Sequence, residues 1–511
     1  MVHRFHGVLA QGPQPRTVFL GTLLFGLPLT VMAATSEQLA MGMLALSLIA
    51  ILLVVAHRWL LSWRILLAGI VLVIMLVPIR RYSLPGALPF ELEPYRVAVA
   101  VIVLGWVGSL LVEPSSRLRR TGLEAPIVAI LVVVGLSVAA NVGRIAALGV
   151  QAEVLKDVTF LASFVCVVYL TASVVRTSAD RDTVLKVLVG GGIFLAITAM
   201  IESRVGYNVF DHLHEVVPML DQATAPLSER LDARGGRQRA YATAQHSIAL
   251  GAALALLAPF AIYLAFRTGR AFWWLGCGIL VMGALATVSR TAVLILVVEV
   301  VVLALLRPEL IRRFWPLALP LLIAIHLAMP GTIGAFKSTF FPTGGLIAEQ
   351  KGGAGTYGSG RIADLGPGIA EFLRTPVVGQ GYGSRVTERS NPKVNASILD
   401  NQWLALTLQT GAAGLFAFAW LILRAVRVLG RRARREEAES GWLPAAFTAA
   451  IAAFGVSMFS YDTFSFIQVT FLLFILFGLA APELRMPLPR RLPATERSQR
   501  RGAPHPALRS V

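Results

Sequence analysis

Charged residues are scarce in this sequence. Asp, Glu, Lys and Arg make up 14% of the 511 residues, whereas hydrophobic residues make up 56%. A soluble globular protein normally covers its surface with about 25% charged residues. The scarcity of charge therefore excludes a soluble protein and indicates a chain with many membrane-spanning segments.

Cysteines and motifs for metals or nucleotides are also scarce. The two cysteines, Cys166 and Cys277, fall inside apolar runs, where we expect small buried residues rather than a disulfide or a metal pair. No His/Cys cluster has the spacing of a zinc site. Glu91 and Glu93 come nearest to a pair of carboxylate ligands, but spacing of that sort arises by chance. There is no Gly-rich phosphate loop and no long cytoplasmic segment for ATP-driven machinery. The sequence thus predicts neither a cofactor nor a metal.

Apolar runs, in contrast, are long and numerous. A run of about 17–25 residues crosses the hydrocarbon of a membrane as a helix. We predict fourteen spans: 17–34, 39–56, 65–79, 95–112, 124–140, 157–175, 184–202, 246–266, 271–287, 291–306, 314–332, 401–424, 443–461 and 464–481. The third run and the two runs flanking Ser289 and Arg290 are the least regular. The expected fold is therefore an all-α polytopic membrane protein with 12–14 transmembrane helices.

The net charge of +18 has two readings. It would suit nucleic-acid binding, but the basic residues gather in short loops on one side of the predicted membrane. Arg117, Arg119 and Arg120 form one such group, and residues 431–435 contain another. This arrangement is the positive-inside signal, and it also attracts anionic membrane lipids. We expect both termini in the cytoplasm, the first apolar run kept as an uncleaved anchor, and no nucleic-acid partner.

Two predicted outside loops are long, residues 203–245 and 333–400. Loops of this length are usually functional or disordered. Apolar residues recur at helical spacing within 361–374, which predicts an amphipathic helix lying on the outer membrane surface. Gly379 and Gly381 follow it in a compact turn.

The chain divides into four parts, with no internal repeat and no second soluble domain. They are N-terminal transmembrane helices with the loop 203–245 (residues 1–245), a core region with the loop 333–400 (246–425), C-terminal transmembrane helices (426–481) and a basic cytoplasmic tail (482–511).

Arginines crowd both long loops. They are Arg230, Arg234, Arg237 and Arg239 in the first loop, and Arg361, Arg374, Arg385 and Arg389 in the second. Guanidinium groups bind phosphate in a bidentate manner and stay charged, so they suit a departing diphosphate without a metal. The alternative is solvated loop charge. Arg290 differs, because it lies in a tight outside turn between two spans, where a positive charge is costly unless it has a partner. The predicted diphosphate-binding residues are Arg239, Arg290, Arg361 and Arg385.

Two residues are candidates for a base that accepts the proton of a sugar hydroxyl. Asp400 precedes Asn401 at the start of one span, and His246 begins another. Both have a structural alternative, because Asp is a preferred helix N-cap and His246 can serve as a polar cap. Glu299 lies in the middle of a span, on the opposite helix face from Arg290, so we expect it to join helices rather than to share the site of Arg290.

The order of several motifs resembles that of a known family. QHSIALG begins one span, TVSRTAVL links two spans, and GSGR and TPVVGQGYGS occupy the second long loop before DNQWLALTLQTGAAGL enters the next span. Over about residues 240–425, this ordered set resembles the O-antigen ligase and polymerase superfamily of bacterial envelope glycosyltransferases.

The resemblance implies a function and a location. Such proteins take a glycan from an undecaprenyl-diphosphate carrier at the periplasmic face of the bacterial inner membrane. They pass it to lipid A core, to another carrier-linked glycan or to protein, without a nucleotide sugar. Arg290 and Arg361 match diphosphate-binding arginines of the family, and the loop helix would shape the acceptor cleft. The resemblance also suggests a chain-length regulator as a partner.

Two departures from the family pattern favour a polymerase over a ligase, or a divergent member whose base lies elsewhere. The family often has His-Asn where this chain has Asp400-Asn401, and an aromatic residue where it has Leu365-Gly366. If the family histidine is the base in ligases, either Asp400 replaces it or the protein is not a ligase. The rival class is a transporter or flippase of lipid-linked oligosaccharide, whose polar residues would gather at mid-membrane in two related halves. A scaffold without catalysis would not explain Arg290.

Overall fold

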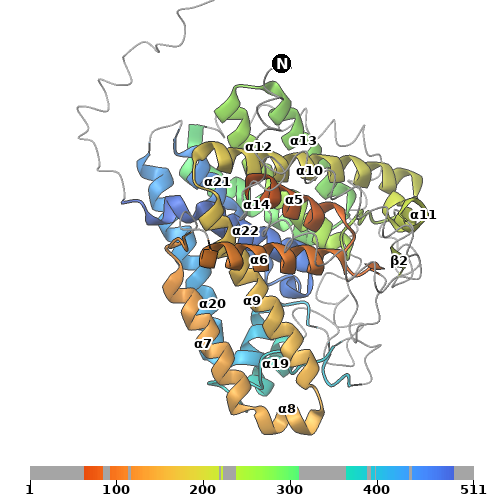
Figure 1. Cartoon of the computed structure of the whole chain (residues 1–511), viewed down its shortest axis with the longest axis vertical. Helices are drawn as coiled ribbons and strands as arrows, with labels where there is room; N and C mark the ends of the chain where they lie inside the picture. Colours follow the sequence, from red (N-terminus) through yellow and green to blue (C-terminus); the bar gives the residue numbers. More distant parts are fainter. Residues whose placement is uncertain are drawn as a thin grey trace, which may run out of the picture.

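The structure, a computed structural model, is helical in almost every part that it describes (Figure 1). It describes residues 63–84, 93–112, 117–217, 220–222, 238–309, 364–387, 393–397, 399–436 and 440–487. Six of the described helices are long and apolar enough to cross a membrane, or seven if one bent pair counts as a single span. The expected all-α polytopic membrane fold is confirmed.

The helices follow the predicted apolar runs. They are α5 (Trp63–Leu76), α6 (Pro94–Val112), α7 (Glu124–Ala140), α8 (Val142–Leu148), α9 (Gln151–Val174), α10 (Ser178–Val205), α11 (Leu213–Val216), α12 (Ser247–Thr268), α13 (Ala271–Ala286), α14 (Arg290–Leu306), α19 (Leu365–Phe372), α20 (Gln402–Arg435), α21 (Trp442–Ser457) and α22 (Ile467–Arg485), with short 3-10 turns at Val209–His212 and Thr463–Ser465. The strand β1 (Tyr82–Ser83) pairs antiparallel with β2 (Asp221–Gln222). Eleven of the fourteen predicted spans coincide with helices, and the runs 17–34, 39–56 and 314–332 lie outside the described residues.

Three helices are longer than their apolar runs. α10 begins at Ser178, because Thr177 and Asp180 form a capping box that satisfies its first backbone N–H groups. α9 begins at Gln151, so the segment between the predicted spans 124–140 and 157–175 forms α8 and the first turns of α9. α20 continues to Arg435, because its alanine and arginine residues are good helix formers. In each case polar residues extend a helix beyond its hydrophobic run.

α12 lies inside the bundle, where it contacts α10, α13, α14 and α21. Small residues permit these contacts, since a Cβ at Gly251 would lie 2.6 Å from the Thr287 hydroxyl and 2.9 Å from Ala292. Close approach of this kind stabilises membrane helices through van der Waals contact. α22 is the second buried helix, and its Phe471 ring packs edge-on against Phe164 of α9 with 4.7 Å between centroids.

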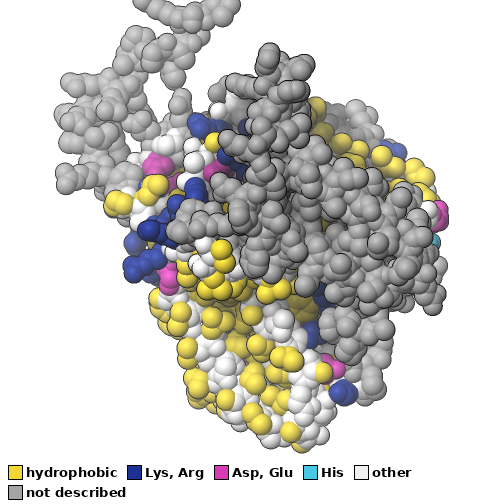
Figure 2. Space-filling view, in the orientation of Figure 1, with side chains coloured by type: hydrophobic (Ala, Val, Ile, Leu, Met, Phe, Trp, Pro, Cys, Tyr) yellow, Lys and Arg dark blue, Asp and Glu magenta, His cyan; other side chains and the backbone are white. Residues whose placement is uncertain are grey.

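α7, α9 and α20 extend together from the body of the molecule, with α8 and α19 at their far end (Figure 1). Apolar side chains cover much of this extension (Figure 2). Leu136, Leu155 and Phe416 on these helices are each more than half exposed. Exposed apolar side chains along a helix of this length are expected where the helix faces lipid.

Ion pairs form at both ends of the helices. Pairs between segments predicted on the inner side are Arg64–Asp180, Arg181–Glu483, Arg267–Asp182, Arg432–Glu436 and Arg432–Glu483. Pairs between segments predicted on the outer side are Arg81–Asp211, Arg96–Glu93, His212–Glu215 and Arg385–Glu371. Each of these pairs joins two segments of the same predicted side, as the alternating direction of successive spans requires.

α20 is broken at Gly411, where φ is +68° and ψ is −167°. The loop after α19 supplies the hydrogen bonds that the break removes. The bonds are Gln380 N–H to Leu408 O at 2.9 Å, Gly381 N–H to Gln409 O at 3.1 Å and Ala412 N–H to Pro376 O at 2.8 Å. An irregular backbone is tolerated within a membrane protein only where such partners exist. The loop and the helix therefore form one structural unit.

Candidate functional site

The loop between α21 and α22, residues 458–466 (the α21–α22 loop), contacts the starts of α12, α14 and α20, near which several predicted site residues lie. The Phe464 N–H donates to Gln402 Oε1, at the start of α20, at 2.7 Å. Thr291, in the first turn of α14, shares a 3.1 Å hydrogen bond with the Ser460 hydroxyl. The starts of α14 and α20 therefore meet on a loop that the sequence indicates only as a tight turn.

The α21–α22 loop also reaches the start of α12. The ring centroids of Phe466 and His246 lie 6.0 Å apart. The N–H of Ile467, the first residue after the loop, donates to Gln245 Oε1 at 2.9 Å. His246 Nδ1 accepts the Ile248 N–H at 3.1 Å and caps α12. A ring nitrogen that accepts a hydrogen bond carries no proton, so the proton of the neutral imidazole lies on Nε2. His246 therefore caps a helix, which is the structural role that the sequence allows as the alternative to a catalytic base.

The Arg239 side chain, from the segment before α12, reaches the turn between α13 and α14, where Arg290 begins α14. Arg239 is buried, and its Nε donates to Thr287 O at 3.5 Å. Arg290 is the first residue of α14 and is half-buried. The preceding Ser289 caps the helix by accepting the Ala292 N–H at 3.4 Å. The structure brings together two of the four arginines predicted to bind a diphosphate.

A buried polar network holds residues 238–246, which carry Arg239. Arg81, after α5, pairs with Asp211 at 2.8 Å, and both side chains are buried. Glu202 accepts the N–H of Ala242 at 2.8 Å, where Ala242 has a left-handed φ of +42°. Buried charges are tolerated only when paired, and a strained backbone persists only where its surroundings fix it. This network therefore fixes the segment that leads into α12.

Asp400 and Asn401 occupy different environments. Asn401 is buried, and its Oδ1 caps α20 by accepting the Leu404 N–H at 3.1 Å. Asp400 is exposed and lies one residue before this cap. The capping role considered for Asp400 therefore belongs to Asn401.

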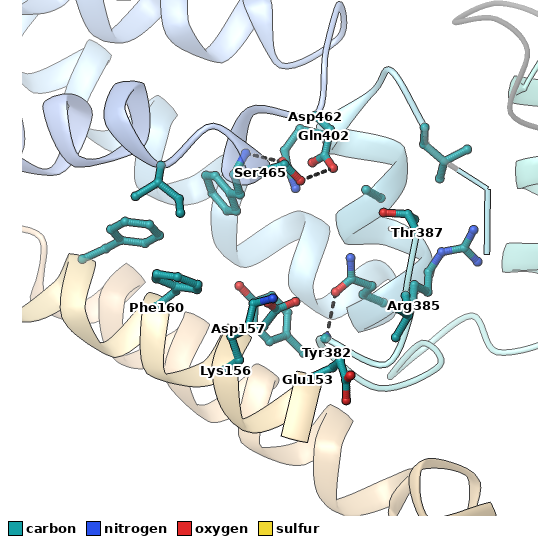
Figure 3. Close-up of a pocket in the computed structure, with 18 of the residues that line it drawn as sticks. Glu153, Lys156, Asp157, Phe160, Tyr382, Arg385, Thr387, Gln402, Asp462 and Ser465 are labelled. Carbon is teal, nitrogen blue, oxygen red and sulfur yellow. Dashed lines mark hydrogen bonds between the residues drawn. The ribbon is translucent and has the colours of Figure 1, made fainter. Parts of the chain in front are cut away.

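A cavity of about 170 Å³ opens beside the α21–α22 loop (Figure 3). α9, α20, the loop after α19 and the α21–α22 loop all contribute to its wall. In Figure 3, Asp157 and Phe160 of α9 lie across the cavity from Asp462 and Ser465. Its charged lining residues are Arg80, Glu153, Lys156, Asp157, Arg385 and Asp462.

Gly379, Gly381 and Arg385 belong to the loop that supports one wall of the cavity. The glycines have left-handed φ angles of +67° and +103°. A Cβ at Gly379 would overlap the backbone of Gln409, so the loop packs against α20 only with glycine there. Arg385 lines the cavity and pairs with Glu371 of α19. Its guanidinium is therefore tied to the loop helix.

The loop helix predicted for 361–374 is present as α19 over Leu365–Phe372. It carries exposed apolar side chains, among them Ile369 and Leu373. Its position on the outer membrane surface stays a prediction. Arg361, the fourth arginine predicted to bind a diphosphate, lies outside the described residues.

The acidic residues of the cavity are not singled out by any sequence motif. Asp462 is an isolated carboxylate in a turn between two spans, and Asp157 lies at the edge of a predicted span. Arg80 is a cation on the predicted outer side, where the positive-inside pattern disfavours one. This departure, which Arg290 shares, is the sequence signal that could identify Arg80 as functional. That Asp157 and Asp462 share a cavity depends on tertiary structure, because α9 and the α21–α22 loop are far apart in the chain.

Within the described ranges, no group of three or more His, Cys, Asp or Glu side chains has the geometry of a metal site. Comparison with curated proteins gives no match. Residues 275–419 match the family model described as O-antigen ligase. This region includes Arg290, Arg385 and Asn401, and it ends before the α21–α22 loop. The resemblance is confirmed over residues 275–419, which are similar to the O-antigen ligase family.

Proposed function

We propose that this protein is an integral membrane glycosyltransferase of the O-antigen polymerase or ligase type. It transfers a glycan from undecaprenyl diphosphate to an acceptor hydroxyl at the outer face of the bacterial inner membrane, in cell-surface polysaccharide biosynthesis. The match of residues 275–419 to the O-antigen ligase family carries the proposal. A polymerase, whose acceptor is another carrier-linked glycan, is preferred to a ligase, because Asp400 stands where the family often has histidine.

The meeting of Arg239 and Arg290 at one turn supports a diphosphate site there. Negative charge grows on the diphosphate as the sugar leaves it, and preorganised guanidinium groups at a membrane edge stabilise that charge without a metal. Arg361 and Arg385 are the further ligands proposed from the sequence, and Arg385 lies at the cavity beside the α21–α22 loop. Asp400 and His246 are the proton acceptors proposed from the sequence.

The proposed partners follow from this reaction. The donor and a carrier-linked acceptor are both lipids, so they reach the protein by diffusion in the membrane. Asn401, Gly379 and Gly381 are proposed to support the site, because Asn401 caps α20 and the two glycines lie where the loop after α19 packs against Gln409 of that helix. Both termini are proposed to lie in the cytoplasm, and a chain-length regulator is the proposed protein partner.

The test uses purified protein in nanodiscs, with undecaprenyl-diphosphate oligosaccharide from the host and without nucleotide or added metal. We expect a ladder of carrier-linked products on a gel. Arg290→Ala should lower the initial rate by about 100-fold or more, because one lost stabiliser of a developing charge typically has that effect. Arg270→Ala is the matched control, since Arg270 is exposed on the predicted inner side.

Other outcomes separate the alternatives. Consumption of the donor only after lipid A core is added would identify a ligase. A donor that stays intact with every acceptor contradicts the transferase proposal. Movement of that intact donor across a sealed vesicle would then favour a flippase.

A further inference from the structure

Asp462 lies in the α21–α22 loop, beyond the residues that match the family. It lines the cavity, and its Oδ2 accepts the Ser465 hydroxyl at 2.6 Å. Figure 3 shows its carboxylate directed at the space that Asp157 of α9 enters from the other side. The cavity therefore has a carboxylate in each of two facing walls.

The lining of this cavity suits a sugar better than a diphosphate. Its three carboxylates, from Glu153, Asp157 and Asp462, would repel a diphosphate. Three cations in the same lining, Arg80, Lys156 and Arg385, balance the charge of these carboxylates. Sugar hydroxyl groups donate to carboxylates and accept from cations, so they use both kinds of group. The rings of Phe160 and Tyr382 add apolar surface to the cavity, as in other sites that orient a ligand through a few polar groups.

The cavity and the turn between α13 and α14 that Arg239 and Arg290 reach (the arginine turn) both contact the α21–α22 loop. Ser460, two residues before Asp462, is bonded to Thr291, which directly follows Arg290. A glycan hydroxyl at Asp462 and a diphosphate at Arg290 would therefore be held by the same short segment. This is the relation that transfer from one to the other requires.

We infer that Asp462 is the base that takes the proton from the acceptor hydroxyl, an inference that rests on the proposed function. As the O–H proton moves to the Asp462 carboxylate, the hydroxyl oxygen forms a bond to the anomeric carbon of the donor sugar. The bond from that carbon to the diphosphate oxygen breaks, and its electron pair leaves with the diphosphate. Arg239 and Arg290 stabilise the charge of that leaving group.

Asp462 meets the requirements of a base more fully than the two residues proposed from the sequence. Asp400 is exposed and does not line the cavity. His246 uses Nδ1 to cap α12, and a second ring proton would break that hydrogen bond. Burial raises the pKa of Asp462 to about 6. It is then a stronger base than an ordinary aspartate and is still ionised at neutral pH.

The charged groups around Asp462 come from four segments. They are Arg80 after α5, Glu153, Lys156 and Asp157 on α9, Asp400 before α20, and Arg385 in the loop after α19. Burial has the largest effect and raises the pKa of Asp462, whereas the Ser465 hydrogen bond lowers it. The charge of Asp400 raises this pKa further, and the charge of Arg80 lowers it. A base must be ionised to act, so turnover should rise as pH increases through about 6.

The test compares Asp462→Asn with wild type in the nanodisc assay, at saturating donor and over a range of pH. Asparagine keeps the size of the side chain and an oxygen for Ser465, so the unfolding temperature should stay close to that of wild type. We expect kcat to fall by about 100-fold or more, as for loss of a general base, with KM for the donor little changed. The rise through about pH 6 should vanish in Asp462→Asn and persist in Asp157→Asn. Glu215→Gln, at an exposed outer carboxylate, is the control for charge alone.

The outcomes separate the inference from the proposed function. Wild-type protein that leaves the donor intact overturns both. An active wild type with an equally active Asp462→Asn overturns the role of Asp462 alone, and so does a pH-dependent rise that vanishes only in Asp400→Asn. If Asp462→Asn does not fold, Asp462→Glu decides, because a displaced carboxylate should keep partial activity with a shifted pH profile. An unshifted profile in Asp462→Glu contradicts the inference.

Discussion

His246, Asp400 and Asn401 show what a sequence conveys about single polar residues at the start of an apolar helix. By position, all three suit a cap, and His246 and Asp400 also suit a catalytic base. The structure separates them, because Asn401 caps α20, His246 caps α12 and Asp400 is exposed. Asp462 becomes a candidate only when its loop is seen to line a cavity. Sequence therefore locates the polar edge of the helices but does not assign its roles.

The capping position of His246 leads to a prediction about stability. His246→Ala removes the acceptor for the Ile248 N–H and should lower the free energy of unfolding by about 1 kcal/mol. His246→Asn should restore most of it, because asparagine is among the best N-cap residues. Thermal unfolding in one detergent measures both variants. An asparagine variant as unstable as the alanine variant would contradict the capping role.

At the scale of elements, apolar runs locate the described helices but not the break in α20. Hydropathy averages over a window, so it is insensitive to one glycine such as Gly411. The break is stabilised by residues 376–381, which are distant in sequence, and that contact exists only in the folded chain. The turn around Gly379 and Gly381 is predictable from its glycines, whereas its partner is not. Hydropathy also does not predict the polar extensions of α9, α10 and α20, because capping and helix propensity determine where those helices begin or end.

Gly379 and Gly366 offer a matched pair of substitutions for this unit. Gly379→Ala places a side chain at φ +67° and against the Gln409 backbone. We expect it to lower the free energy of unfolding by about 1–3 kcal/mol from backbone strain alone. Gly366→Ala meets no atom within 4 Å and lies in α19, so it should be neutral or slightly stabilising.

The measurement combines thermal unfolding with hydrogen exchange. In wild type, the amides of Gln380 and Gly381 should exchange slowly although they lie in a loop, because they donate to α20 carbonyls. Gly379→Ala should speed their exchange, and Gly366→Ala should not. Equal exchange in the two variants would show that the loop and α20 do not form one unit.

At the scale of the whole molecule, the charged residues indicate that successive spans cross the membrane in alternating directions. The distribution of arginines predicts which segments share a side, and the described ion pairs join segments in agreement with it, for example Arg181 with Glu483 and Arg81 with Asp211. The way in which helices cluster around α12 and α22 is not readable from the sequence, because all the runs are similarly apolar. Helix contacts depend on small residues and side-chain fit, which hydropathy does not contain.

Labelling of single cysteines tests the predicted sides. The background replaces Cys166 and Cys277 with alanine. Asp221→Cys and Arg270→Cys lie at exposed positions on opposite predicted sides. A membrane-impermeant thiol reagent should label Asp221→Cys in spheroplasts, and Arg270→Cys only after the membrane is opened. The reverse pattern would place the cavity and the arginine turn on the cytoplasmic side.

The position of the α21–α22 loop in the chain affects when the protein becomes competent during its synthesis. Chains fold from the N-terminus as they emerge, so the hairpin of α21 and α22 is the last described pair of helices to be inserted. Until it arrives, Gln245, Thr291 and Gln402 have no loop to bind, and the cavity lacks the wall that carries Asp462. A nascent chain that lacks α21 and α22 therefore carries its arginine turn without the facing carboxylate, and the site closes only once this hairpin is inserted.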